Sequence, residues 1–269
     1  MLTNGLYLLL SLLPPASAAA GPSAPVVAIA AQEPAPNPNP DKRPELETVL
    51  GKLDGHIKKE GKEDQDAVGV IDTLLQEFPK SGPKDRVAIV KQLSKCFEQR
   101  RMVPEGQAPN NKLFLAAAVA LGQMGPESVE VLTTWIGAKN LKKDLAVQHR
   151  LILSLGKTKE KKGLKVLKDM LNNKENSLIS ASAEALGEYA GADLETRKDV
   201  FEALLKTVME AKGFKDTNPD NTIARDKYDV IAAPIITSLG KLSKHEERDP
   251  EKWQNWWNKN KKADWDKDS

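Results

Sequence analysis

The sequence is poor in the residues that most often carry chemistry or cross-links. Its 269 residues include one cysteine and three histidines, and aromatic residues make up only 5%. The single cysteine, Cys96, excludes an intramolecular disulfide, and a lone cysteine among apolar helix positions is typical of a small core residue. His56, His149 and His245 lie far apart in the sequence, so it offers no Ser/His/Asp or Cys/His arrangement. We therefore expect no catalytic residues, no metal site and no cofactor.

The chain also lacks an excess of charge of either sign, and it lacks strand patterns. There are 40 Lys and Arg against 38 Asp and Glu, which gives a net charge of +2. A balance this close to zero gives no electrostatic argument for nucleic acid or for an anionic membrane surface. Alternating β-branched residues are absent, whereas Leu, Ala, Lys and Glu recur at helical spacing. These patterns predict an all-α protein.

The first 31 residues have the pattern of a secretory signal peptide. An apolar run over 6–13 is followed by Pro14, Pro15 and small residues, and 16–18, 18–20 and 28–30 all fit a small-x-small cleavage rule. The run is too short to span a bilayer, so no stable membrane span remains after cleavage. We therefore expect export to the periplasm or the extracellular space, although no Lys or Arg precedes the run and the cleavage site stays open.

A proline-rich segment follows at residues 32–43. Five prolines fall within 32–44, which excludes a helix or a central strand there. We expect an extended, disordered linker at 32–43, a folded part at 44–262 and a short tail at 263–269.

The folded part contains a repeat. Four apolar helical segments end in Leu-Gly, at 121–122, 155–156, 186–187 and 239–240, with successive gaps of 34, 31 and 53 residues. A second amphipathic helix follows each pair. The Leu would be a core knob, and the Gly would either end its helix with positive φ or let a neighbouring backbone come close. Alanines such as 116–118, 181 and 183 would allow the first helices to stack closely. Such two-helix units bury their apolar faces by stacking into a solenoid.

This pattern resembles HEAT-like repeats, in the short bacterial class whose first helix ends in A-L-G. VALGQMGPESVEVL and EALGEYAGADLETRKDVFEALL are the closest matches, and the resemblance covers roughly 64–260. It implies a right-handed α-α superhelix of about five helix pairs plus one leading helix. It also implies an armadillo-like scaffold that binds a protein or peptide along its inner face, which the second helices line. The 53-residue gap departs from the pattern.

Two enzyme classes border this family. HEAT-repeat hydroxylases bind two irons through several His-Glu pairs, whereas this chain has one, at 245–246. Phycobilin lyases share the repeat, and nothing beyond the repeat supports a lyase. An enzyme is therefore the third interpretation.

The tryptophans gather at the C-terminal end. Trp253, Trp256 and Trp257 have i, i+3, i+4 spacing after Asp249 as N-cap and Pro250 at N1, so they share one face of a helix. The last repeat of a solenoid has an apolar face that no further repeat covers, and three indoles would cap it. Other exported HEAT-repeat proteins end in a similar W-x-x-W-W helix. The alternative is an exposed platform that binds a carbohydrate or peptide, with Trp265 either folded back or free.

Two surface features are candidate sites. Segment 216–227 places Asp216, Asn218 and Asp220 at positions 1, 3 and 5 of a calcium-loop pattern, but Asn221 and Lys227 replace its Gly and its bidentate Glu. A polar turn is therefore the favoured interpretation, with a calcium site as the alternative. On the helix near 160–171, one face carries a lysine stripe, a candidate docking surface for an acidic partner or else a solvated face: Lys161, Lys165 and Lys168.

Overall fold

The computed structural model describes residues 39–98 and 110–267. The predicted signal peptide and most of the predicted linker lie outside this range. The described part is all-α and contains no strand, as predicted. Its helices are α1 (Pro44–Ile57), α2 (Asp64–Glu77), α3 (Pro83–Ser94), α4 (Lys112–Gln123), α5 (Val129–Trp135), α6 (Leu145–Lys157), α7 (Lys161–Met170), α8 (Asn176–Gly187), α9 (Leu194–Thr217), α10 (Thr222–Ser243) and α11 (Pro250–Asn260). Short 3₁₀ turns follow or precede several of them, at Phe78–Lys80, Lys95–Phe97, Gly125–Ser128 and Glu188–Gly191.

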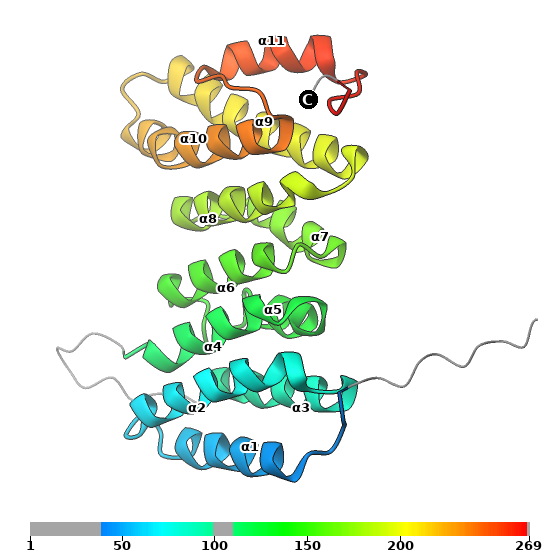
Figure 1. The fold of residues 1–269 in the computed structure, drawn as a ribbon. Helices are drawn as coiled ribbons and strands as arrows, with labels where there is room; N and C mark the ends of the chain where they lie inside the picture. The colour runs from blue at the N-terminus through cyan, green and yellow to red at the C-terminus, as the bar shows by residue number, and fades with distance from the viewer. Residues whose placement is uncertain (1–38, 99–109, 268–269) are drawn as a thin grey trace, which may run out of the picture. The chain divides into compact units, whose positions relative to one another are not determined.

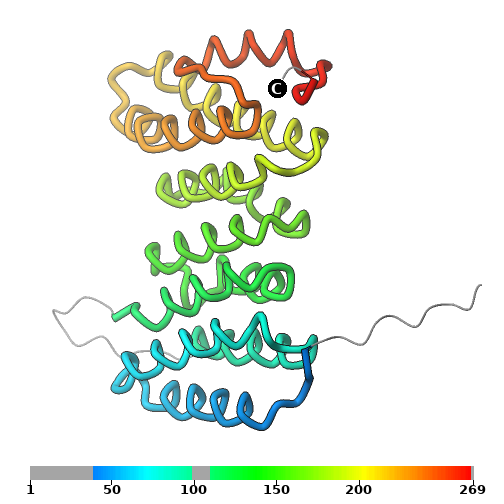
Figure 2. Tube along the Cα trace, in the orientation of Figure 1, coloured from blue at the N-terminus to red at the C-terminus, as the bar shows by residue number. Residues whose placement is uncertain are grey.

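The helices stack in one direction, with α1 at one end and α11 at the other (Figure 1, Figure 2). A first layer is formed by α2, α4, α6, α8 and α10, each of which packs on the next. In a second layer, α1, α3, α5 and α7 are neighbours in that order, and α11 packs on α9. Within the described residues this is one leading helix followed by five helix pairs, which confirms the predicted α-solenoid.

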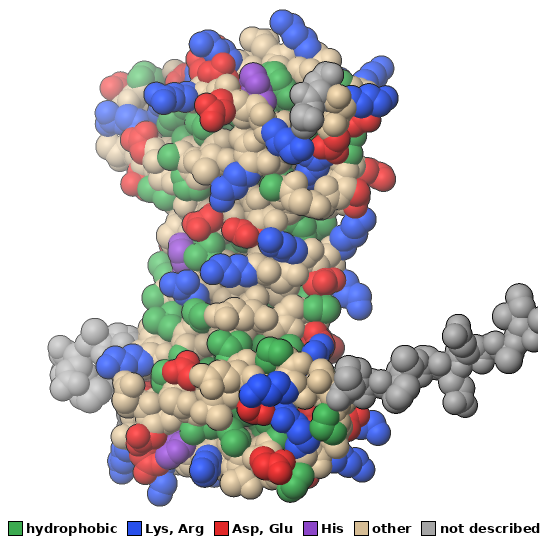
Figure 3. All heavy atoms as spheres, in the orientation of Figure 1, with side chains coloured by type: hydrophobic (Ala, Val, Ile, Leu, Met, Phe, Trp, Pro, Cys, Tyr) green, Lys and Arg blue, Asp and Glu red, His purple; other side chains and the backbone are tan. Residues whose placement is uncertain are grey.

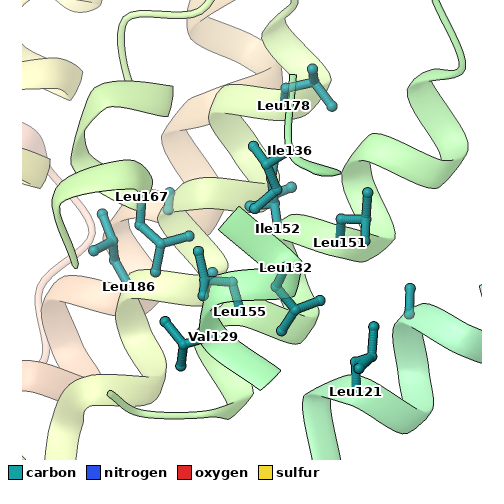
Figure 4. Packing of buried hydrophobic residues seen from close by; sticks show 14 of the residues in the cluster. Leu121, Val129, Leu132, Ile136, Leu151, Ile152, Leu155, Leu167, Leu178 and Leu186 are labelled. Carbon is teal, nitrogen blue, oxygen red and sulfur yellow. The ribbon is translucent and has the colours of Figure 1, made fainter. Parts of the chain in front are cut away.

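One apolar cluster runs through the whole stack, from Leu46 in α1 to Trp265 after α11. The leucines of the four Leu-Gly pairs are fully buried in it: Leu121, Leu155, Leu186 and Leu239. Figure 4 shows three of them on neighbouring first-layer helices, with Leu132 of α5 and Leu167 of α7 beside them. The leucines therefore act as the predicted core knobs and join the two layers.

Three of the four glycines of the Leu-Gly pairs allow close helix packing, and none of the four has positive φ. A Cβ atom on Gly122 would lie 2.9 Å from Cβ of Ser154, and one on Gly156 would lie 2.6 Å from Cα of Ala185. A Cβ on Gly187 would lie 2.6 Å from Oγ of Ser238. Each glycine thus meets the small residue two places before the glycine of the next pair. Of the two roles considered for these glycines, the structure shows the close approach.

Two details differ from the sequence pattern. Val87, on α3, is 59% exposed, although its spacing of three and six residues from the buried Val90 and Leu93 suggests one shared apolar face. A repeated spacing of three drifts by about 60° per step around a 3.6-residue helix, which carries Val87 off the face. The 53-residue gap has a simple cause, because α9 has 24 residues and α10 has 22, about twice the length of α8.

The last residues of the predicted disordered linker pack on the α2–α3 connection. Oδ1 of Asp41 accepts a hydrogen bond from the backbone N–H of Lys84 at 2.9 Å, and the backbone N–H of Lys42 donates to Asp85 at 2.7 Å. The Arg43 guanidinium pairs with Glu77 at 2.7 Å. Residues 39–43 thus differ from the expected tether, because all five of them have polar partners on the first repeat.

Candidate functional site

The predicted lysine stripe lies on α7, and every member has an acidic partner. The Nζ atoms of Lys161, Lys165 and Lys168 lie 2.7 Å from the carboxylates of Asp193, Asp169 and Asp199. The Asp193 carboxylate raises the pKa of Lys161 through a hydrogen bond, and this lysine in turn holds the pKa of Asp193 well below its usual range. Because its positive charge is already balanced, the stripe offers little net attraction to an acidic partner. On the face shown in Figure 3, basic and acidic side chains are likewise interspersed.

The C-terminal tryptophans surround one phenylalanine. The ring of Phe201, on α9, has its centroid 5.6 Å from Trp253, 5.5 Å from Trp256 and 5.1 Å from Trp257. Trp265 folds back onto the same ring at 5.4 Å. Trp253 is fully buried and Trp257 is 8% exposed, so these indoles face the solenoid rather than solvent. The arrangement covers the end of the second layer.

Hydrogen bonds fix the orientation of this tryptophan cap, which we define as the four indoles around Phe201. The indole N–H of Trp253 donates to the carbonyl of Glu247 at 3.1 Å, and that of Trp265 donates to the carbonyl of Asn260 at 3.0 Å. The N-cap of α11 is as predicted, since Asp249 accepts from the N–H of Glu251 at 2.8 Å. Buried indoles need such N–H partners, so the cap is a specific structure and not merely an apolar contact.

A buried arginine under the cap was not predicted. Arg197, on α9, is 2% exposed and donates to the carbonyl of Leu242 at 3.1 Å and to the carboxylate of Asp266. Its guanidinium also lies 5.9 Å from the Trp265 ring. Its position four residues before Phe201 on the buried face of a helix was a usable signal. No sequence pattern indicated its partner in the tail, Asp266.

The calcium-loop pattern at 216–227 is mostly helical. Asp216 lies in the last turn of α9 and pairs with Lys212 at 2.6 Å. Asn221 is the N-cap of α10, where its side chain accepts from the N–H of Ala224 at 3.1 Å. The amide of Asn218 donates to the carbonyl of Phe214 at 2.9 Å. These side chains form hydrogen bonds and an ion pair at the ends of α9 and α10, which agrees with the interpretation of 216–227 as a polar turn.

The three histidines are separate in the fold. His56 lies 2.8 Å from Glu63 at the α1–α2 connection, and His149 lies on α6, where burial lowers its pKa. His245 follows α10 and stacks on Trp256 with centroids 5.2 Å apart. Across residues 39–98 and 110–267, no group of three or more His, Cys, Asp or Glu side chains is placed to hold a metal ion.

A hollow lies at the C-terminal end of the first layer. It has a volume of about 810 Å³ and lies between α10, the connection 244–249 and the start of α11. We call it the end groove and define it by its lining residues: Ile236, Thr237, Gly240, Lys241, Lys244, His245, Glu246, Glu247, Arg248, Asp249 and Lys252. Helical periodicity does not predict it, because it depends on how three successive elements within 236–252 lie against one another.

Comparison with known proteins identifies the repeat. A family model for HEAT repeats matches residues 106–207, which span α4 to α8 and the first part of α9. Neither the curated proteins nor the solved structures include a match to this chain. None of the helices in the described ranges is long and apolar enough to cross a membrane.

Proposed function

We propose that this HEAT-repeat protein is a non-catalytic scaffold that binds a partner protein or peptide along the long face formed by α3, α5, α7 and α9. HEAT repeats commonly mediate contacts between proteins, and that face is the one the family resemblance implies. Export of the chain, with removal of the predicted signal peptide at 1–31, is part of the same proposal.

The observation that carries the proposal is that the stack is preformed from end to end. The glycine contacts set the spacing of α4, α6, α8 and α10, and the tryptophan cap seals α9. At the other end, α1 buries Leu46, Leu53 and Ile57 and turns charged side chains outward. A surface held in this way needs little ordering on association, so most of the contact energy remains available for binding.

The test is cross-linking followed by mass spectrometry on the full chain in the envelope fraction of its own organism. We expect cross-links from lysines of the second layer, such as Lys91 and Lys162, to one recurrent partner. Sequencing the first residue of the mature protein from the same preparation tests export. Recovery of the chain without any cross-linked protein, or with cross-links only from first-layer helices, would contradict the proposed face.

The alternatives have less support in the geometry. A carbohydrate platform needs exposed rings, whereas Trp253, Trp257 and Trp265 are buried around Phe201. A calcium site needs convergent oxygen ligands, whereas Asp216 and Asn221 are used within their own helices. A lyase-like activity has no observation in its favour.

A further inference from the structure

The tail that follows α11 folds back onto α9 through one aromatic and one acidic side chain. Trp265 is 8% exposed, whereas the other residues of 261–267 are exposed and form no helix. The centroid of its ring lies 5.4 Å from that of Phe201. The neighbouring carboxylate of Asp266 accepts a hydrogen bond from the buried guanidinium of Arg197. In Figure 1 this red tail turns back from the end of α11 toward α9. Two adjacent side chains thus anchor the tail.

The surface under the tail is positively charged. We call it the tail pocket and define it by the residues that contact the tail from α9, α11 and the end of α10: Arg197, Lys198, Phe201, Lys244 and Trp257. Lys198 donates to the carbonyl of Ala263 at 2.6 Å, and Lys244 lies 3.5 Å from Asp266. Within 39–98 and 110–267, the three cations of the pocket have no acidic partner other than Asp266. Because an unpaired guanidinium in a buried position is unfavourable, the pocket requires a carboxylate.

The tail satisfies this arginine only in part. Asp266 binds Nη2 of Arg197, and Nη1 donates to the carbonyl of Leu242 at 3.1 Å. Nε, which lies on the same edge of the guanidinium as Nη2, is buried and has no hydrogen-bond partner among the described residues. A carboxylate placed side-on would accept from Nε and Nη2 together, which is the strong bidentate geometry of arginine. The chain's own tail is therefore an incomplete ligand, and a segment that is not tethered to α11 is free to take the side-on position.

We propose that the tail pocket is a docking site for an aromatic–acidic segment of a partner protein, and that the chain's own tail occupies it as an internal ligand. The aromatic ring of the partner replaces the indole of Trp265 against Phe201. Its carboxylate, one or two residues further on, accepts from Nε and Nη2 of Arg197. The ring supplies contact area, and the carboxylate supplies selectivity. The inference rests on the proposed protein-binding function, but it concerns a different surface from the second-layer face.

A second copy of the chain is a less suitable occupant, because the tail is short. The indole N–H of Trp265 donates to the carbonyl of Asn260 at 3.0 Å, so the chain turns directly after α11. Even when extended, the backbone from Asn260 to Trp265 spans at most about 18 Å. Two α11 helices side by side already occupy about 20–24 Å. A tail exchanged between two copies would therefore not reach the neighbouring pocket.

The experiment is a selection of random peptides displayed on phage against the full chain with Trp265→Ala/Asp266→Ala, which we call the tail variant. Its tail no longer competes for the pocket. We expect enriched peptides to carry an aromatic residue followed within two positions by Asp or Glu. The same peptides should bind the wild type at least about tenfold more weakly, because a tethered competitor has a high effective concentration. The matched control is Lys261→Ala/Lys262→Ala, two exposed residues of the same tail, which should bind them as weakly as the wild type does.

Arg197→Met, made in the tail variant, tests the contact with the carboxylate. It should weaken the selected peptides by about tenfold or more. It should also abolish their preference for Asp or Glu over Asn or Gln at the acidic position, which a merely structural role of the arginine would not do. The control is Arg225→Met, an exposed arginine on α10, which should change neither the affinity nor the preference.

A third measurement uses the wild-type chain and needs no variant to fold. An excess of the synthetic peptide Lys-Ala-Asp-Trp-Asp-Lys, the sequence of residues 262–267, should displace the tail. Hydrogen exchange in 263–267 should then rise, while exchange in α5 and α7 should stay unchanged. The same peptide with Asn in place of its second Asp should have no such effect.

Four results would overturn the inference: enriched peptides without the aromatic–acidic pair, equal binding by the wild type and the tail variant, no effect of Arg197→Met, or unchanged hydrogen exchange in the wild-type tail. If circular dichroism shows that the tail variant does not fold, the exchange measurement alone decides. A concentration-dependent dimer that the tail variant abolishes would assign the pocket to a second copy and would also overturn the inference. If the pocket fails these tests while a partner is still cross-linked to the second layer, the scaffold function stands and only the tail-pocket inference fails.

Discussion

Replacement of Gly156 by alanine tests the spacing of the first layer. The added Cβ would lie 2.6 Å from both Cα and Cβ of Ala185, whereas ordinary contact begins at 3.4 Å. The neighbours are backbone and a methyl group, neither of which can rotate away. Helices α6 and α8 must therefore separate locally by roughly 0.8 Å, which loosens the packing around Leu155 and Leu186.

The control is Gly213→Ala, in the interior of α9, where an added Cβ meets nothing within 4 Å. Alanine is favoured over glycine in a helix by about 1 kcal/mol, and this gain is common to both variants. The free energy of unfolding of Gly213→Ala should therefore exceed that of the wild type by about 0.4–1 kcal/mol. The free energy of unfolding of Gly156→Ala should be lower than that of Gly213→Ala by about 1–3 kcal/mol, which is the usual cost of overpacking.

The assay is urea unfolding of the full chain, monitored by circular dichroism. The urea midpoints of the two variants are compared directly where their m-values are equal. Since each repeat contacts only its neighbours, Gly156→Ala should also weaken the coupling between the halves of the stack. Hydrogen exchange should then show α1–α6 and α8–α11 opening more independently. If Gly156→Ala stabilises the chain as much as Gly213→Ala does, the close-approach role of the Leu-Gly glycines is refuted.

Three further predictions concern the cap. Phe201→Ala leaves four indoles without their common contact and should cost about 3–5 kcal/mol in urea unfolding, with a red shift of tryptophan emission. Trp256→Ala should lower stability without lowering partner binding in a pull-down; the reverse result would favour a binding platform. The Arg197 guanidinium lowers the pKa of Asp266, so this pair stabilises the fold above the unfolded pKa of about 3.9 and its contribution is lost as pH falls. Asp266→Asn should therefore lower the melting temperature near neutral pH, and the difference from wild type should shrink in acid.

Most of the fold could be predicted because it follows from the local helical spacing of apolar residues. Each Leu-Gly segment and each second helix shows its buried face within one or two turns, so helix positions and their pairing follow from the sequence. The role of the glycines did not follow. A glycine at the end of an apolar helix is compatible with a positive φ or with a close neighbour, and only the position of Ala185 or Ser238 in the next repeat decides.

The surfaces were harder to predict because they depend on contacts between distant residues. The lysines of α7 form a stripe in sequence, yet two of them pair with Asp193, the N-cap of α9, and with Asp199 of α9. The end groove needs the path of the 244–249 connection across α10, which no periodicity encodes. The tail is a further case, since Asp266 contacts Arg197, 69 residues earlier in the chain, and the adjacent Trp265 lies on Phe201.

The two ends of the described stack differ in the face that they turn outward. A terminal helix that only stops the stack turns a polar face outward, as α1 does with the exposed Glu45, Glu47 and Lys52. The outward face of α10 instead carries Ala233, Ile236 and Gly240, none of which is charged or fully buried. Charged residues at those positions would be compatible with the same helix and would protect the end from unwanted contacts. The first layer is therefore the less protected of the two at this end, since the tryptophan cap on α9 closes the second layer.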